Sequence, residues 1–85
     1  MNEEAKNEVI KMLTRHMNSI KSRMQSQINF VKKNERLYFA SIKDSGWGSL
    51  AHSARELAKG YDEIAFLEKE IKAIEERIAD VKENY

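Results

Sequence analysis

Apolar residues recur at alternating steps of three and four in the stretch IAFLEKEIKAIEERIADV, residues 64–81. The recurring positions are Ile64, Leu67, Ile71, Ile74, Ile78 and Val81. This spacing is the heptad pattern of coiled-coil helices, in which the a and d positions are apolar and face a neighbouring helix. The stretch therefore predicts a long helix with one continuous apolar seam.

The same pattern continues on both sides of this stretch and reappears in the first half of the chain. Leu50 and Leu57 precede it, and Tyr85 follows it. The earlier series consists of Ile10, Leu13, Met17, Ile20, Met24, Val31, Tyr38 and Ile42, with the polar residues Gln27 and Asn34 at two intervening positions. Strict alternation of apolar and polar residues, the pattern of a half-buried strand, is nowhere sustained. The sequence predicts an all-α fold.

The segment DSGWGS, residues 44–49, separates the two series and contains two of the three glycines of the chain. Gly46 is expected to end the first helix, and Ser49 is expected to cap the second. We predict one domain over residues 1–85, with a helix over 3–43, a turn over 44–48 and a helix over 49–84. A short link makes two long helices antiparallel neighbours, so the fold class is an antiparallel two-helix coiled-coil hairpin.

Two weaker points are expected within these helices. The polar segment KNE, residues 33–35, interrupts the apolar series and predicts a softer break in the first helix. Gly60 is expected to loosen the second helix, because glycine costs about 1 kcal/mol relative to alanine in a helix.

Charge supports pairing of the first helix with the second. Residues 9–43 carry eight Lys or Arg and one acid, whereas residues 44–85 carry ten acids and six Lys or Arg. Opposite charges beside a seam select the partner helix and its orientation. Folding about the turn predicts the seam pairs Leu13 with Ile78, Met17 with Ile74 and Met24 with Leu67, with Lys21 near Glu68 or Glu75 and Arg23 near Glu70.

Several large apolar residues lie outside the a and d positions, namely Phe30, Leu37, Phe39 and Phe66. A hairpin has no enclosed core, and domains of this size gain only about 3–5 kcal/mol from one core. We therefore expect the hairpin to dimerise into a four-helix bundle, as a homodimer, or to dock on another protein.

The chain contains few groups arranged for catalysis or metal binding. It has no cysteine, which excludes disulfides, thiolate metal sites and cysteine nucleophiles. His52 and Glu56 are four residues apart, but the Glu-x-x-His pairs of di-metal bundles are absent. Asp44, Ser49 and His52 have no scaffold that would hold a hydrolytic triad, and no glycine-rich phosphate loop is present. We expect no enzymatic activity, no metal and no cofactor.

Two groups of residues are candidates for binding. The aromatic group is expected to form either a small core that closes the loop or an exposed anchor for a partner protein, because Trp, Tyr and Arg dominate binding hot spots. It consists of Phe30, Tyr38, Phe39, Trp47, Tyr61 and Phe66. The basic group provides the charge that phosphate binding requires, although the net charge of the chain is only +1. It consists of Lys21, Arg23, Lys32, Lys33, Arg36 and Lys43.

The N-terminus lacks a basic region followed by an apolar stretch, so we expect no secretory signal. No apolar run approaches the ~20 residues that span a bilayer, and the absence of cysteine fits a reducing compartment. We expect a soluble cytoplasmic protein that makes no membrane contact.

The leading interpretation is a small protein-interaction module, an adaptor, regulator or inhibitor, and the profile also fits an accessory protein of a phage or mobile element. The alternative is a nucleic-acid-binding regulator that uses the basic first helix.

Overall fold

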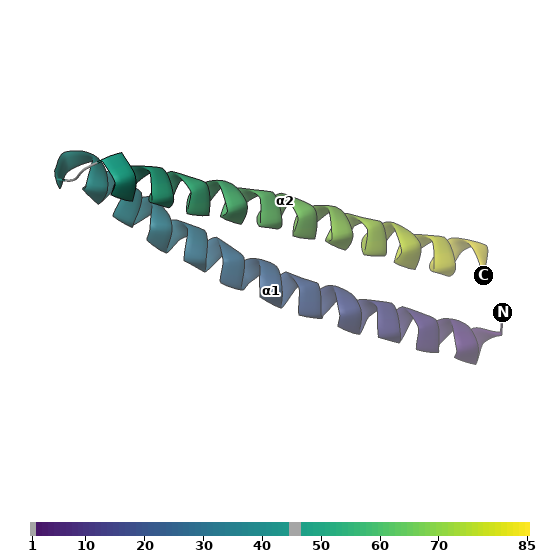
Figure 1. The fold of residues 1–85 in the computed structure, drawn as a ribbon. Helices are drawn as coiled ribbons and strands as arrows, with labels where there is room; N and C mark the ends of the chain where they lie inside the picture. Colours follow the sequence, from purple (N-terminus) through teal and green to yellow (C-terminus); the bar gives the residue numbers. More distant parts are fainter. Residues whose placement is uncertain (1, 45–46) are drawn as a thin grey trace.

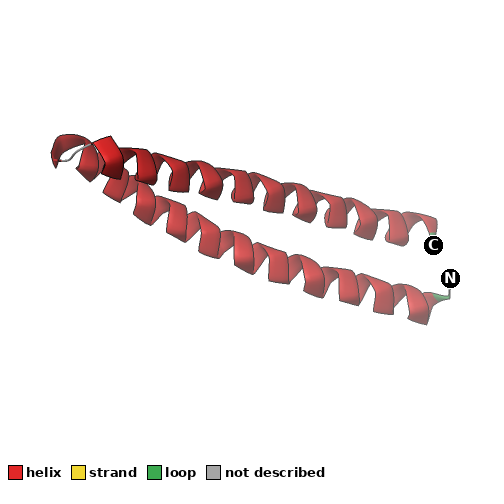
Figure 2. Cartoon of the chain, viewed as in Figure 1, coloured by secondary structure: helices red, strands yellow, loops and turns green. Residues whose placement is uncertain are grey.

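Two long helices make up the described part of the chain. The computed structural model describes the backbone of residues 2–44 and 47–85, and the side chains of residues 2–40, 42 and 51–85. Helix α1 covers Glu3–Asp44 and helix α2 covers Trp47–Asn84, and these described residues include no strand. The two helices run side by side along their length, as Figures 1 and 2 show. The all-α fold and the helical hairpin predicted from the sequence are confirmed.

The hairpin is an extended rod whose two chain ends lie at the same pole (Figure 1). Its principal dimensions are 63 × 15 × 13 Å. At the N-terminal end of α1, the Asn2 side chain accepts a hydrogen bond of 2.7 Å from the backbone N–H of Ala5, which is an N-cap. Lys6 Nζ donates a hydrogen bond of 2.8 Å to the carbonyl oxygen of Lys82, so it joins the start of α1 to the end of α2.

The helix bounds differ from the predicted ones around the turn. Asp44 is the last residue of α1, and α2 begins at Trp47, so both residues leave the predicted turn of residues 44–48. Ser49 lies inside the first turn of α2, and its predicted role as the N-cap is therefore wrong. The predicted helix-ending role of Gly46 lies outside the described residues.

The seam between the helices contains the buried apolar residues. Six apolar side chains are buried in the described part of the chain, and all six occupy positions of the predicted heptad series. They are Ile20, Val31, Leu57, Leu67, Ile71 and Val81. Ile20, Leu67 and Ile71 form one cluster at mid-length, against which Met17, Met24 and Ile74 pack. The members of two predicted pairs, Met17 with Ile74 and Met24 with Leu67, all belong to this group of residues.

Gly60 lies in this seam, opposite Val31, and the residue is buried. A Cβ atom built on Gly60 would overlap Val31 Cγ2. The missing side chain of Gly60 therefore lets the two helices approach closely at this level. Helix α2 nevertheless continues through Gly60 from Trp47 to Asn84, and the expected propensity cost of Gly60 stays a prediction.

The predicted break at residues 33–35 is also absent, since α1 is helical throughout. The Asn34 side chain donates a hydrogen bond of 2.9 Å to the carbonyl oxygen of Phe30, so the polar group of this seam residue is satisfied within its own helix. Ile42, expected in the seam, is 54% exposed. Two successive steps of four, from Asn34 to Tyr38 and on to Ile42, rotate Ile42 away from the seam, because four residues exceed one helical turn.

An ion pair connects the two helices beside the seam. Arg23 Nη2 lies 2.5 Å from Glu63 Oε1, so the expected pairing of Arg23 with Glu70 is corrected to Glu63. Glu63 and Glu70 lie one heptad apart on the same side of α2. A long Arg side chain can reach either of them, so the register alone does not select between them.

Candidate functional site

Two hollows between the helices open on one face of the hairpin, which we call the groove face. The central groove, at mid-length, is lined by Lys21, Met24, Gln25, Glu68, Ile71, Lys72 and Glu75. The aromatic groove, nearer the turn, is lined by Glu35, Tyr38, Phe39, Ala54, Leu57, Ala58 and Tyr61. Lys21 and Glu35 are two heptads apart on α1, and Tyr61 and Glu68 are one heptad apart on α2, so both grooves share a face.

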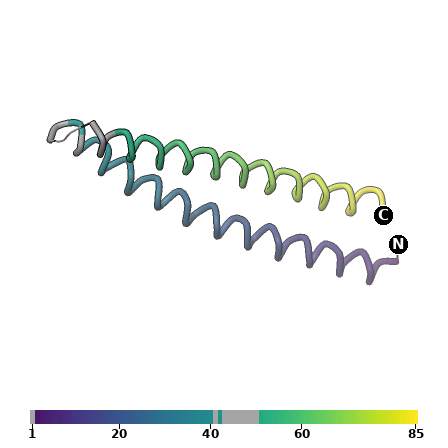
Figure 3. Tube along the Cα trace, viewed as in Figure 1, coloured from purple at the N-terminus to yellow at the C-terminus, as the bar shows by residue number. Residues whose placement is uncertain are grey.

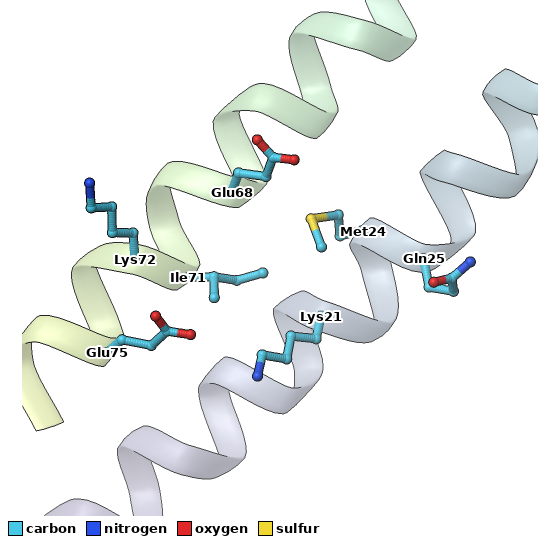
Figure 4. A pocket seen from close by; sticks show the side chains of 7 residues that line it. All are labelled: Lys21, Met24, Gln25, Glu68, Ile71, Lys72 and Glu75. Atoms are coloured by element: carbon cyan, nitrogen blue, oxygen red, sulfur yellow. The ribbon is translucent and has the colours of Figure 1, made fainter.

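The central groove has an apolar floor and a charged rim. Its volume is about 560 Å³. Met24 of α1 and Ile71 of α2 project into the space between the helices, as Figure 4 shows. Lys21 on α1 and Glu75 on α2 stand on opposite sides of that space (Figure 4). The rim therefore combines both signs of charge around an apolar strip, and the expected position of Lys21 near Glu68 and Glu75 agrees with this lining.

The aromatic groove is apolar and has a volume of about 430 Å³. Buried Leu57 lies at its base, whereas Phe39 is 62% exposed and Tyr61 is 50% exposed. The rings of Tyr38 and Phe39 meet edge to face with centroids 5.7 Å apart. Exposed aromatic rings beside a hollow are the elements of a docking site for an apolar side chain.

Glu35 and Tyr61 connect the two helices across the aromatic groove. Tyr61 Oη donates a hydrogen bond of 2.5 Å to Glu35 Oε1. This hydrogen bond to the carboxylate is the main reason why the pKa of Tyr61 is raised above its ordinary value of 10.0, with smaller contributions from burial and from the charge of Glu35. Glu35 is the sole acid among residues 9–43, and it is directed at Tyr61 rather than at the outer surface of α1.

The structure brings together only part of the aromatic group predicted from the sequence. Tyr38, Phe39 and Tyr61 line one groove. Phe30 lies on the opposite face, in a smaller hollow of about 280 Å³ that it shares with Gln27, Glu56, Lys59, Gly60 and Glu63. Phe66 lines none of these hollows and is 53% exposed. The side chain of Trp47 lies outside the described residues, so its role as an anchor stays a prediction.

The basic residues predicted to contact nucleic acid lie on the surface. Lys21, Arg23, Lys32, Lys33 and Arg36 are exposed, and the side chain of Lys43 lies outside the described part. Lys21 borders the central groove, and Arg23 is paired with Glu63. Lys33 and Arg36 occupy heptad positions of α1 that point away from α2, whereas Lys32 shares the heptad position of Gln25 and Phe39, beside the groove face.

The groups considered for chemistry are described in part. His52 is exposed, while Glu56 lies 3.4 Å from Lys59 Nζ in an ion pair. The side chains of Asp44 and Ser49 lie outside the described residues. Across the described ranges, no three His, Asp or Glu side chains gather closely enough to hold a metal ion. Within the same ranges, neither helix has an apolar window sufficient to cross a bilayer.

The sequence reasoning missed the alanines of the groove face. Ala54 and Ala58 line the aromatic groove, and both are exposed. They belong to a second series at steps of three and four on α2, formed by Ala51, Ala54, Ala58, Tyr61 and Ala65. This series would have predicted an additional apolar face on α2 beside the seam.

Comparison of the chain with protein-family models, with curated proteins and with solved structures finds no match in any of the three. The function proposed below therefore depends on the residues and geometry of the hairpin alone.

Proposed function

We propose that this chain is a small protein-interaction module, an adaptor, regulator or inhibitor, that docks an apolar helix of a protein partner on its groove face. The observation that carries the proposal is the exposed ring of Phe39 beside the aromatic groove. Helix-in-groove recognition uses an apolar strip with large side chains at its edges, and aromatic residues carry much of the binding energy. Both elements are present in the aromatic groove.

Assembly into a four-helix bundle forms part of this proposal. The seam of one hairpin buries six apolar side chains among the described residues, while Phe39, Ile42 and Tyr61 are each at least half exposed. A helix whose apolar surface is wider than a two-helix seam needs a further helix to cover it. Two more helices on the groove face would cover these residues.

Affinity capture from the native host tests the proposal. We expect tagged parent chain to retain a protein partner after nuclease treatment, and we expect Phe39→Asp to lose at least about 90% of it, since hot-spot truncations cost about 2 kcal/mol or more. Phe66→Asp is the matched control, because Phe66 is similarly exposed and lies outside the grooves. Equal retention by Phe39→Asp and the parent would contradict the proposed docking site.

A second function, nucleic-acid binding, is supported by a separate observation on α1. Lys32, Lys33 and Arg36 are exposed side chains of one stretch of α1, and the nearby acid Glu35 is engaged by Tyr61. This stretch therefore carries three positive charges, and its nearest acid in the sequence is directed at α2, which favours phosphate contact.

The triple variant Lys32→Gln, Lys33→Gln and Arg36→Gln separates this function from the first. If α1 binds nucleic acid, affinity in a gel-shift or anisotropy titration falls steeply with salt, and the triple variant loses most of it while its helical content is unchanged. Loss of activity in the host for the triple variant, together with full activity of Phe39→Asp, would replace the protein-docking proposal with this one.

A further inference from the structure

The hairpin exposes more surface than a compact monomer of its mass would. The hairpin exposes 6446 Å² of surface. A globular monomer of 9.9 kDa would expose about 5,200 Å². The difference of roughly 1,200 Å² exceeds the ~800 Å² per partner that a standard stable interface buries. A partner as long as the hairpin itself could cover a surface of this size.

We propose that the occupant of the groove face is a second copy of this chain, placed turn beside turn, with the two-fold axis running along the rods. This inference rests on the proposed function and names its partner. In this arrangement each α1 lies on the α2 of the other copy, and all neighbouring helices are antiparallel. In the reverse arrangement, with the rods pointing in opposite directions, α1 would lie on α1 and α2 on α2.

The charges of the two helices distinguish these arrangements. Helix α1 carries nine Lys or Arg against five acids, and α2 carries six against nine. The turn-beside-turn arrangement sets a positive helix against a negative one, whereas the reverse arrangement sets like charges together. At the central groove it places Lys21 at the level of Glu68 and Glu75 of the second copy, because these residues share one level along the rod.

The apolar residues of the groove face favour the same arrangement. Phe39, Ile42 and Tyr61 are exposed in the half of the rod nearer the turn, and the alanine series of α2 lies beside them. In the turn-beside-turn arrangement, these residues face the same group of residues on the second copy, so both groups become buried. In a fully overlapped reverse arrangement, Phe39 and Ile42 would meet the open end of the rod, where the groove-face positions of α1 are the polar residues Glu4, Asn7 and Lys11.

A spin label at one cysteine measures the arrangement directly, because the chain has no cysteine of its own. Glu83 is exposed and lies beside the open end of the rod, so Glu83→Cys provides the labelling site. Turn beside turn, the two labels sit at the same end of a body two hairpins wide, so pulsed dipolar spectroscopy should give about 30 Å from widths of 15 and 13 Å. The reverse arrangement places the labels at opposite ends, near the 63 Å length of the rod or beyond it.

Sedimentation across micromolar concentrations supplies the second readout. We expect a dimer whose dissociation constant rises at least about tenfold in Phe39→Asp and stays within about twofold of the parent in Phe66→Asp. Circular dichroism confirms that both variants fold. A monomer at all concentrations, a label separation near the 63 Å rod length, or dissociation by Phe66→Asp alone would each overturn the inference.

The two proposals fail in different ways. If the parent is a monomer and captures a host protein that Phe39→Asp fails to capture, the self-association is overturned and the protein-docking function stands. If the parent is a turn-beside-turn dimer and Phe39→Asp captures host proteins as the parent does, the protein-docking function is overturned and the self-association stands.

Discussion

Gly60 and Val31 determine how closely the two helices approach. Gly60→Ala gains about 1 kcal/mol of helix propensity, but the new methyl group overlaps Val31, whose β-branched side chain cannot turn away freely. Overpacking costs about 1–3 kcal/mol, so we expect a net loss of about 1 kcal/mol and a melting temperature lower by roughly 4–8 °C. The change in melting temperature is measured by thermal unfolding monitored by circular dichroism.

The double variant Gly60→Ala with Val31→Ala is the control for this contact. Removing the Val31 methyl groups creates the space that the new methyl group at position 60 needs. The double variant should therefore be more stable than the two single losses predict by about 1 kcal/mol. A Gly60→Ala variant that melts above the parent would show that helix propensity outweighs packing at this position.

The ionisation of Tyr61 should make the stability of the folded chain depend on pH in the alkaline range. Its pKa is raised in the folded chain by the hydrogen bond to Glu35, so the neutral phenol is the favoured form. A raised pKa contributes stability that is fully present below 10.0 and is lost as the pH rises through the folded value. We expect the melting temperature to fall above a pH of 10.0 more steeply in the parent than in Tyr61→Phe.

Glu35→Gln tests the cause of that shift. Without the carboxylate, Tyr61 should ionise at a lower pH in a spectrophotometric titration of a chain in which Tyr38 and Tyr85 are replaced by Phe. An unchanged titration would mean that the hydrogen bond from Tyr61 to Glu35 is not what raises the pKa of Tyr61.

At the scale of the helices, the seam is the contact that holds α2 against α1. Ile71 is buried in the cluster with Ile20 and Leu67, so Ile71→Asp would place an unpaired charge among apolar side chains. The cost is about 3–5 kcal/mol, and we expect loss of the cooperative thermal transition. Ala73→Asp is the matched control on the exposed side of α2, and it should melt within a few degrees of the parent.

The helices could be predicted from the sequence because apolar residues at steps of three and four all face the same side only when the chain is helical. The details that failed depend on local competition. Ser49 is a good cap residue in isolation, yet α2 begins earlier, at Trp47. Asn34 interrupts the apolar series, but its side chain bonds within the helix and α1 continues.

Half of the candidate site could be predicted in the same way. Distance from the turn correctly grouped Tyr38, Phe39 and Tyr61 at one end. It could not assign a face, because Phe30 precedes a seam residue and Phe39 follows one, and this difference places their rings on opposite sides of the hairpin. The alanines were missed because small side chains give a weak hydrophobic signal.

At the scale of the whole molecule, the hairpin is far from globular. Its radius of gyration is 19.0 Å, whereas a compact domain of this length would have about 12 Å. Figure 3 shows the Cα trace running the length of the rod along α1 and back again along α2. Every seam contact therefore joins residues that are distant in sequence, except near the turn, and the rod has a large surface for its mass.

The bond between Lys6 and the Lys82 carbonyl also has a consequence for protein engineering. It keeps the start of α1 and the end of α2 within reach of one side chain. The hairpin could therefore replace a few residues of a surface loop in a host domain without forcing the two junctions apart. Because α1 rises about 1.5 Å per residue, such an insertion would display Tyr38 and Phe39 roughly 50 Å from the host surface. The molecule would then serve as a stiff spacer with the exposed rings of the aromatic groove at its far end.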